Sequence, residues 1–177
     1  MNKLIDFCKT NNINMVIVGP EIPLANGMVD YLEQGEIKAF GPTRSAAELE
    51  SSKIFMKEIC KKYNLPTAKY EEFSDPQSAL DYVSNSIYPI VIKADGLAAG
   101  KGVTIADNID DAKTAIVDCL INNKFGNSGK KIVIEEFLEG KEASYFVITD
   151  GKTIFSLGFA QDYKPIFDDN KGPNTGG

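Results

Sequence analysis

The sequence predicts a mixed α/β (α+β) chain, in which a parallel α/β segment precedes a smaller α+β module. Three observations lead to this fold class. Helix-like and strand-like patterns alternate over residues 1–43, as they do in parallel sheets. An apolar β-branched run, a glycine-rich loop and a second β-type run follow one another at residues 89–105. Two more strand-like runs flank Asp150-Gly151, a dipeptide typical of type I′ hairpin turns.

The composition is that of an ordinary globular protein and argues against several functions. The 177 residues are 43% hydrophobic and 25% charged, with a formal net charge of −6. Without a long basic run, such a chain is a poor nucleic-acid binder, because binding needs positive charge along the phosphates. No apolar run reaches transmembrane length, so no membrane partner is expected. The absence of histidine removes histidine bases and histidine metal sites.

Cysteine usage indicates a reducing compartment. Cys8, Cys60 and Cys119 are far apart and odd in number, and no two of them form a Cys-x-x-Cys pair. Such thiols are typical of packing residues in cytoplasmic proteins. We therefore expect a cytoplasmic protein, and no metal site within this chain.

The N-terminal segment is expected to be the back half of a Rossmann-like domain. It starts with a helix and has too few strands to close a stable sheet. The predicted elements are a helix at residues 4–8, a buried strand at 13–18, a helix through 27–32 and a strand at 37–40.

Gly19, Pro20 and Glu21 follow the first of these strands. Ligands of open α/β sheets bind outside the carboxyl ends of strands, so these residues are candidate substrate contacts. A plain turn between a strand and a helix fits the same spacing equally well.

A single long helix is predicted at residues 45–63. Ser45-Ala46-Ala47-Glu48 has the pattern of a capping box, and Asn64 ends the helix. Lys53 lies within it and, taken alone, is most simply a solvated lysine. The expected inward-facing stripe consists of Ile54, Phe55, Ile59 and Tyr63.

The α+β module is expected between Leu65 and Ile134, which divides the chain into parts 1–64, 65–134 and 135–177. Its predicted elements are a strand at residues 69–73, a helix capped by Ser74-Asp75-Pro76, the hairpin around the glycine-rich loop, a helix that starts at 107–111, and a strand at 131–138.

The glycine-rich loop carries the clearest chemical signal. Lys93 precedes it, and Lys101 lies in it among Gly96, Gly100 and Gly102. A Walker A loop is excluded, because Gly96 to Gly100 is one residue short and a strand follows. Each glycine costs roughly 0.5–1 kcal/mol relative to alanine, and we expect the three to bury nothing in return. We interpret the loop as a lid that binds polyphosphate. The alternative is a surface hairpin with edge lysines.

Acidic residues follow the last strand of the module. Glu135 and Glu136 end the apolar run, and Glu142 comes shortly after them. A polar turn is the commoner explanation of such acids. The alternative is a purine-binding hinge, in which a carboxylate or backbone carbonyl accepts the adenine amino proton and Glu142 binds ribose hydroxyl groups.

Several motifs together resemble one family. They are Val18-Gly19-Pro20-Glu21, Phe40-Gly41-Pro42-Thr43, Ser52-Lys53, the run from Lys93 to Val103, Glu135-Glu136-Phe137-Leu138 and the glycine-rich residues 172–177. Over essentially its whole length, the chain is similar to the phosphoribosylamine–glycine ligase (glycinamide ribonucleotide synthetase) family of ATP-grasp enzymes. The resemblance implies an ATP-grasp fold with a partial Rossmann-like N-terminal domain, a small α+β lid and the start of the main domain. It also implies further segments before Met1 and after Gly177.

The resemblance implies roles for single residues. Lys53 and Lys93 are similar to the two catalytic lysines that contact ATP phosphates, with the loop at Gly96–Gly102 as the lid. The residues that resemble the adenine and ribose contacts are Glu135, Glu136, Leu138 and Glu142. Those that resemble the substrate side of the cleft are Asp162, Lys164, Asn174, Thr175 and Gly176.

The implied reaction is ATP-dependent ligation of glycine to 5-phosphoribosylamine through a glycyl phosphate, in purine biosynthesis. ATP and Mg²⁺ are the implied cofactors, and the metal ligands are expected after Gly177. The implied partners are these small molecules, with a monomer or weak dimer as the oligomeric state. This segment alone is expected to be inactive. Two alternatives stay open: another ATP-grasp ligase or carboxylase, and a non-catalytic nucleotide-binding module.

Overall fold

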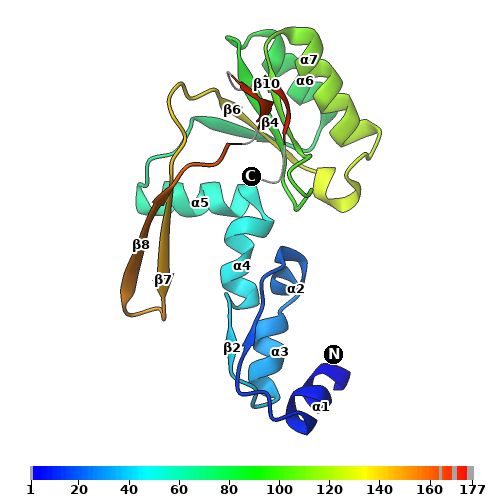
Figure 1. Cartoon of the computed structure of the whole chain (residues 1–177). Coiled ribbons are helices and arrows are strands. Elements are labelled where there is room, and N and C mark those ends of the chain that lie inside the picture. The colour runs from blue at the N-terminus through cyan, green and yellow to red at the C-terminus, as the bar shows by residue number, and fades with distance from the viewer. Residues whose placement is uncertain (1, 164, 169–170, 175–177) are drawn as a thin grey trace. The chain divides into compact units, whose positions relative to one another are not determined.

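The computed structural model describes residues 2–163, 165–168 and 171–174. The chain consists of two compact units, residues 1–137 and 138–177, and each is described here by itself (Figure 1). The first unit combines helices and strands, and the described elements of the second unit are strands, so the chain is of the expected mixed α/β class. The finer limits at residues 64 and 134 stay a prediction. None of the described helices is both long and apolar enough to cross a bilayer.

The first unit begins with a small parallel α/β layer. Helices α1 (Asn2–Thr10) and α3 (Met28–Gln34) pack on a parallel pair, β1 (Val16–Ile17) and β2 (Ala39–Phe40). The parallel pairing was expected, but a buried strand over residues 13–18 is wrong. Only two residues pair, and Ile17 is 68% exposed, because helices cover a single face of this pair among the described residues.

The helix expected through residues 27–32 is interrupted at its start. Two helices, α2 (Glu21–Ala25) and α3, meet at Gly27, which has a left-handed φ of 81°. Glycine adopts this conformation without the steric penalty that a Cβ brings, so the chain turns between the two helices.

The long helix expected at residues 45–63 is also two helices, α4 (Arg44–Ser51) and α5 (Lys53–Tyr63). Ser52 between them has extended backbone with φ −139°, and its hydroxyl accepts a hydrogen bond from Phe55 N–H at 3.1 Å. A serine that caps a helix in this way starts a new helix rather than continuing the old one. The sequence rule missed this because Ser52 fits a helix interior equally well.

The ends of these helices partly match the expectation. The capping box at residues 45–48 is wrong, since Thr43 caps α4 and its hydroxyl accepts from Ala46 N–H at 3.4 Å. Asn64 ends α5 in a left-handed conformation, as expected. Of the inward stripe, Ile54 is buried, whereas Tyr63 is 61% exposed at the last turn of α5.

A four-stranded antiparallel sheet forms the centre of the first unit, in the order β3–β6–β4–β5. Its strands are β3 (Tyr70–Phe73), β4 (Ile90–Ala94), β5 (Val103–Ala106) and β6 (Ile132–Glu136). Helices α6 (Pro76–Ser84) and α7 (Ile109–Ile116) lie side by side against this sheet (Figure 1). A π-helical turn (Val117–Ile121) and a 3₁₀ turn (Gly126–Gly129) connect α7 to β6.

Side-chain alternation gives the sheet two different faces. Ile90, Ile92 and Ala94 of β4 belong to the apolar core under α6 and α7, as do Ile132 and Ile134 of β6. Successive strand residues point to opposite faces. The residues between them, including Lys93 of β4 and Glu135 of β6, therefore lie on the face away from α6 and α7.

The second unit consists of two antiparallel pairs. One joins β7 (Ser144–Thr149) to β8 (Ile154–Ala160), and the other joins β9 (Pro165–Phe167) to β10 (Lys171–Asn174). The hairpin was expected, but its type I′ turn is wrong. Of the Asp150-Gly151 pair only Gly151 has positive φ, at 86°. The Asp150 carboxylate accepts from Lys152 and Thr153 N–H at 2.9 and 2.7 Å, which stabilises a longer loop.

Candidate functional site

The start of α5 and the end of β4 are held together by Asp95. Its carboxylate Oδ1 accepts hydrogen bonds from the Ser52 hydroxyl at 3.0 Å and from Ile54 N–H at 2.9 Å. Its carbonyl oxygen accepts from Lys53 N–H at 3.1 Å. Asp95 thus caps α5 from another segment, which fixes the first turn of the helix against the glycine-rich loop.

Lys53 lies at this junction. Its Nζ donates to the carbonyl oxygens of Asp95 at 3.3 Å and Gly96 at 3.2 Å. Burial lowers the pKa of Lys53 below 10.5, and the nearby positive charge of Lys93 acts in the same direction, while Glu50, Asp95 and Glu135 oppose it. An amine whose charge is poorly compensated is well suited to bind an anion, because the anion restores the missing counter-charge.

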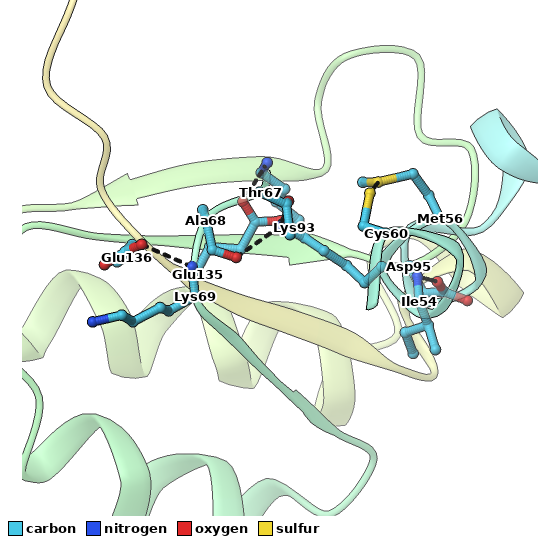
Figure 2. A network of polar contacts seen from close by, with 11 residues as sticks. Ile54, Met56, Cys60, Thr67, Ala68, Lys69, Lys93, Asp95, Glu135 and Glu136 are labelled. Atoms are coloured by element: carbon cyan, nitrogen blue, oxygen red, sulfur yellow. Dashed lines mark hydrogen bonds and ion pairs between the residues drawn. The ribbon is translucent and has the colours of Figure 1, made fainter. Parts of the chain in front are cut away.

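Lys93 and Glu135 form an ion pair on the same side of the sheet. Lys93 Nζ lies 2.9 Å from Glu135 Oε2, while Glu135 Oε1 lies 3.3 Å from Nζ of Lys57 on α5. The side chains of Lys57 and Glu135 are 2% and 6% exposed, whereas Lys93 is 27% exposed. Figure 2 shows Lys93 beside Glu135 and the contacts of Asp95 with Ile54. Of these three side chains, that of Lys93 is therefore the one that a ligand can reach from solvent.

The glycine-rich loop has a fixed base and an exposed tip. Gly96 N–H donates to Ser128 carbonyl at 3.0 Å, and the Ser128 hydroxyl donates to Leu97 carbonyl at 2.7 Å. At the tip, Gly100 is exposed with φ +73° and has open space around it, and Lys101 is also exposed. The loop thus presents one lysine and free backbone to solvent above a base that is anchored by hydrogen bonds.

The space around the three glycines of this loop differs from one position to the next. A Cβ at Gly96 would lie 2.6 Å from Ser128 Oγ, and one at Gly102 would lie 2.7 Å from Ala98 Cβ. The expectation that all three glycines bury nothing is therefore wrong for Gly96 and Gly102, which allow close packing. Gly100 alone lies in open space.

Glu136 contacts backbone at the start of β3. Its carboxylate Oε1 accepts from Lys69 N–H at 2.8 Å, and its own N–H donates to Lys69 carbonyl at 3.0 Å (Figure 2). Glu136 also lines a cavity of about 470 Å³, together with Tyr82, Ile87 and Ile90. Ile90 belongs to the core under α6 and α7. The lining also includes Glu135 and Ser86, so this cavity lies where β6 ends beside the C-terminal end of α6.

The remaining predicted residues are divided among three places. Gly19, Pro20 and Glu21 are exposed together at the carboxyl end of β1, where substrate contacts were expected. The second unit contains Leu138, Glu142, Asp162 and the backbone of Asn174. Lys164, Thr175 and Gly176 lie outside the described residues.

Two functional candidates were missed by the sequence reasoning, Lys57 and Asp95. Lys57 follows Ile54 by one helical turn, so it lies on the inward stripe, where a lysine is unusual and signals a buried partner. Asp95 directly follows a buried strand, a place where polar side chains often meet a ligand or a helix end. Among the described residues, no group of three or more cysteine, aspartate or glutamate side chains is arranged to hold a metal ion.

Comparisons with known proteins point in one direction. A family model described as the ATP-grasp (A) domain of phosphoribosylglycinamide synthetase matches residues 51–177, and a model of the N domain of the same enzyme matches residues 1–50. The chain is 52% identical over 174 residues to phosphoribosylamine–glycine ligase of Neisseria meningitidis serogroup B, covering 98% of this chain and 41% of that protein. It is 53% identical over 175 residues to the ligase of Streptococcus pneumoniae serotype 4, covering 99% and 42%.

Solved structures agree with these matches. The crystal structure of phosphoribosylamine–glycine ligase from Thermotoga maritima has a TM-score of 0.72 and 37% identity, over 78% of this chain and 35% of that one. The biotin carboxylase domain of Hydrogenobacter thermophilus 2-oxoglutarate carboxylase has a TM-score of 0.71 at 21% identity, over 89% and 36%, which shows the shared fold alone. The chain spans about two fifths of the length of the curated relatives it matches.

Proposed function

Because the chain belongs to the phosphoribosylglycinamide synthetase family, with the ATP-grasp fold, we propose that it forms the nucleotide-binding part of a ligase. The ligase joins glycine to 5-phosphoribosylamine with ATP, in purine biosynthesis. The observation that carries this proposal is that Lys53 Nζ binds the carbonyl oxygens of Asp95 and Gly96, at the base of the glycine-rich loop that Lys93 of β4 precedes. The relatives matched here do not favour another ATP-grasp activity or a non-catalytic module.

Lys53 and Lys93 are the proposed catalytic residues, and they act on the ATP phosphates. Lys53 lies on α5 and Lys93 lies on β4, so a triphosphate between them would be bound from two sides. Charge-assisted hydrogen bonds of this kind are about twice as strong as neutral ones. Lys101 and the backbone at Gly96, Gly100 and Gly102 would cover the phosphates from the loop.

The proposed reaction has two steps. A carboxylate oxygen of glycine attacks the γ-phosphorus of ATP, and ADP leaves with the electrons of the broken P–O bond. The amine of phosphoribosylamine then attacks the carbonyl carbon of the glycyl phosphate, the C–O bond to phosphate breaks with its electrons leaving on phosphate, and the nitrogen loses one proton to solvent as the amide forms. Positive charge from Lys53 and Lys93 would stabilise the negative charge that develops on the phosphoryl oxygens and on ADP. No covalent bond to the protein is needed.

Further contacts are proposed on the basis of family membership. Adenine and ribose would be bound by the hinge at Glu135, Glu136 and Leu138 and by Glu142. The substrates would be bound by Gly19, Pro20, Glu21, Asp162, Lys164, Asn174, Thr175 and Gly176.

Magnesium is proposed as a companion of ATP. The described residues form no group of three or more carboxylate or cysteine side chains that fits a Mg²⁺ ion. We also propose a cytoplasmic protein, which the three unpaired cysteines support. A monomer or weak dimer is the proposed oligomeric state.

The test of the activity is ADP release by the protein expressed from the complete gene, with magnesium ATP. We expect release only when glycine and phosphoribosylamine are both present. ADP release in the absence of glycine or of phosphoribosylamine would overturn the ligase assignment. The absence of ADP release when both substrates are present would overturn it as well.

The nucleotide site is tested separately with Lys93→Met. We expect this variant to lose at least about tenfold in ATP affinity, because a charge-assisted contact contributes about 1.5–3 kcal/mol. Lys3→Met is the matched control, since Lys3 is an exposed lysine on α1. Equal ATP affinity of the Lys93 variant and the wild type would refute the site.

A further inference from the structure

Lys57 is a buried lysine that the proposed chemistry does not use. Its side chain is 2% exposed, and its Nζ donates to the Thr67 hydroxyl at 2.7 Å and to Ala68 carbonyl at 3.3 Å. The same Nζ lies 5.2 Å from the centre of the Tyr70 ring. These contacts hold Lys57 in place, so it is not available to reach a bound nucleotide.

The carboxylate of Glu135 is shared between two lysines, one oxygen to each. Oε2 accepts a hydrogen bond from Lys93, while the buried Oε1 has the ion pair with Lys57 at 3.3 Å and no hydrogen bond. Because Glu135 is 6% exposed, water does not compensate its charge. A buried carboxylate that loses its cation is strongly unfavourable.

We propose that Lys57 is a positioning residue that keeps Glu135 neutralised, so that Lys93 can direct its charge to the nucleotide phosphates. The inference rests on the proposed phosphate-binding role of Lys93. Lys57 acts through Glu135 and does not touch the ligand. It belongs to none of the motifs that suggested the nucleotide site.

The charges of the three side chains support this role. Lys57 and Lys93 are positive and Glu135 is negative, so together they carry one net positive charge. Without Lys57, the remaining pair of Lys93 and Glu135 is neutral. If Lys93 then turned to a phosphate, the buried carboxylate of Glu135 would have no cation beside it. The cost of that step would appear as weaker nucleotide binding. If Glu135 is neutral as well, Lys93 carries the positive charge alone and the penalty disappears.

A double-mutant cycle tests this coupling by isothermal calorimetry with magnesium ATP and the full-length protein. We expect Lys57→Met to weaken ATP binding about tenfold, within the range common for coupled groups. Lys57→Met/Glu135→Gln is expected to bind ATP within about threefold of Glu135→Gln alone, because the cycle isolates the interaction between the two residues. Lys61→Met is the matched control, since Lys61 is an exposed lysine on the same helix, and it is expected to bind like the wild type.

The outcomes separate the inference from its alternatives. If Lys57 acts only by packing, the losses add and Glu135→Gln does not rescue the Lys57 variant, which overturns the inference. If Lys57→Met fails to fold, the comparison of the double variant with Glu135→Gln still decides, because neither leaves an unpaired buried carboxylate. A wild type that binds no ATP would also overturn it. Wild-type ATP binding with rescue, but without glycine-dependent ADP release, would refute the ligase activity and leave the coupling intact.

Discussion

The contact between Asp95 and the start of α5 gives the sharpest prediction about stability. Asp95→Ala removes the carboxylate that accepts from the Ser52 hydroxyl at 3.0 Å and from Ile54 N–H at 2.9 Å. Asp95→Asn keeps an oxygen acceptor and removes only the charge. The two variants therefore separate the hydrogen bonds from the charge, and both leave the backbone contact with Lys53 in place.

The expected losses follow from the two hydrogen bonds. A hydrogen bond to a charged group contributes about 1.5–3 kcal/mol, and a helix cap about 0.5–2 kcal/mol. Because Asp95 is only half-buried, we take the lower part of the summed range, about 2–4 kcal/mol for Asp95→Ala. Asp95→Asn should lose about 1 kcal/mol, the difference between a charged and a neutral acceptor.

Urea unfolding followed by circular dichroism measures these losses. With a slope of about 1–3 kcal/mol per molar urea, Asp95→Ala should lower the midpoint by about 1 M or more. Asp107→Ala is the matched control, because Asp107 is an exposed aspartate that follows β5 as Asp95 follows β4. An unchanged midpoint for Asp95→Ala would refute the idea that Asp95 joins the loop to α5.

Two further predictions concern the same region. Gly96→Ala should lower the free energy of unfolding by about 1–3 kcal/mol, because its Cβ would lie 2.8 Å from the backbone Cα of Ser128. Gly100→Ala is the control, since its Cβ meets no neighbour and the variant has only the strain of a left-handed backbone. Equal urea midpoints for the wild type and Gly96→Ala would contradict this prediction. Burial lowers the pKa of Lys53 below 10.5, so the unfolded chain binds more protons there as pH approaches that value. Wild-type stability should therefore rise relative to Lys53→Met over this alkaline range, and parallel pH curves would count against it.

Local sequence signals predicted the elements well where one rule applied. Asp75-Pro76 starts α6 with the Asp75 carboxylate accepting Ser78 N–H at 2.8 Å, as the sequence indicated. The β4–β5 hairpin and the end of α5 at Asn64 were likewise predictable. In each case the residue that sets the conformation is also the residue that the pattern recognises.

Two of the errors arise where a distant segment decides the conformation, and the capping-box error has a local cause. Nothing in residues 45–63 shows that Ser52 will leave the helix, because part of the reason is Asp95, far along the chain. The capping box failed because Thr43 precedes it and also caps well. Ile17 was expected to be buried because of its apolar neighbours, but burial depends on which elements cover the strand.

The candidate site shows the same division between local and distant information. Lys93 and the glycine-rich loop were evident from spacing, whereas Lys53 was identified only through family resemblance. Lys57 and the sharing of Glu135 were not predictable, because they depend on the pairing of β4 with β6 and on the packing of α5. The sequence of one strand does not show which residues of another strand it will contact.

The register of β4 and β6 makes the cluster of Lys57, Lys93 and Glu135 sensitive to a change of length within β6, whereas a change outside the paired residues leaves it intact. In the β4–β6 pair, Val91 is opposite Glu135 and Lys93 is opposite Val133, so the ion pair runs diagonally across the two strands. Deleting one residue inside β6 would exchange its two faces, placing Glu135 in the apolar core and Ile134 beside Lys93. Residues 122–124, between the π-helical turn and the 3₁₀ turn, are exposed and lie outside this pairing. Length variation among related sequences should therefore accumulate at residues 122–124 and be absent from β6.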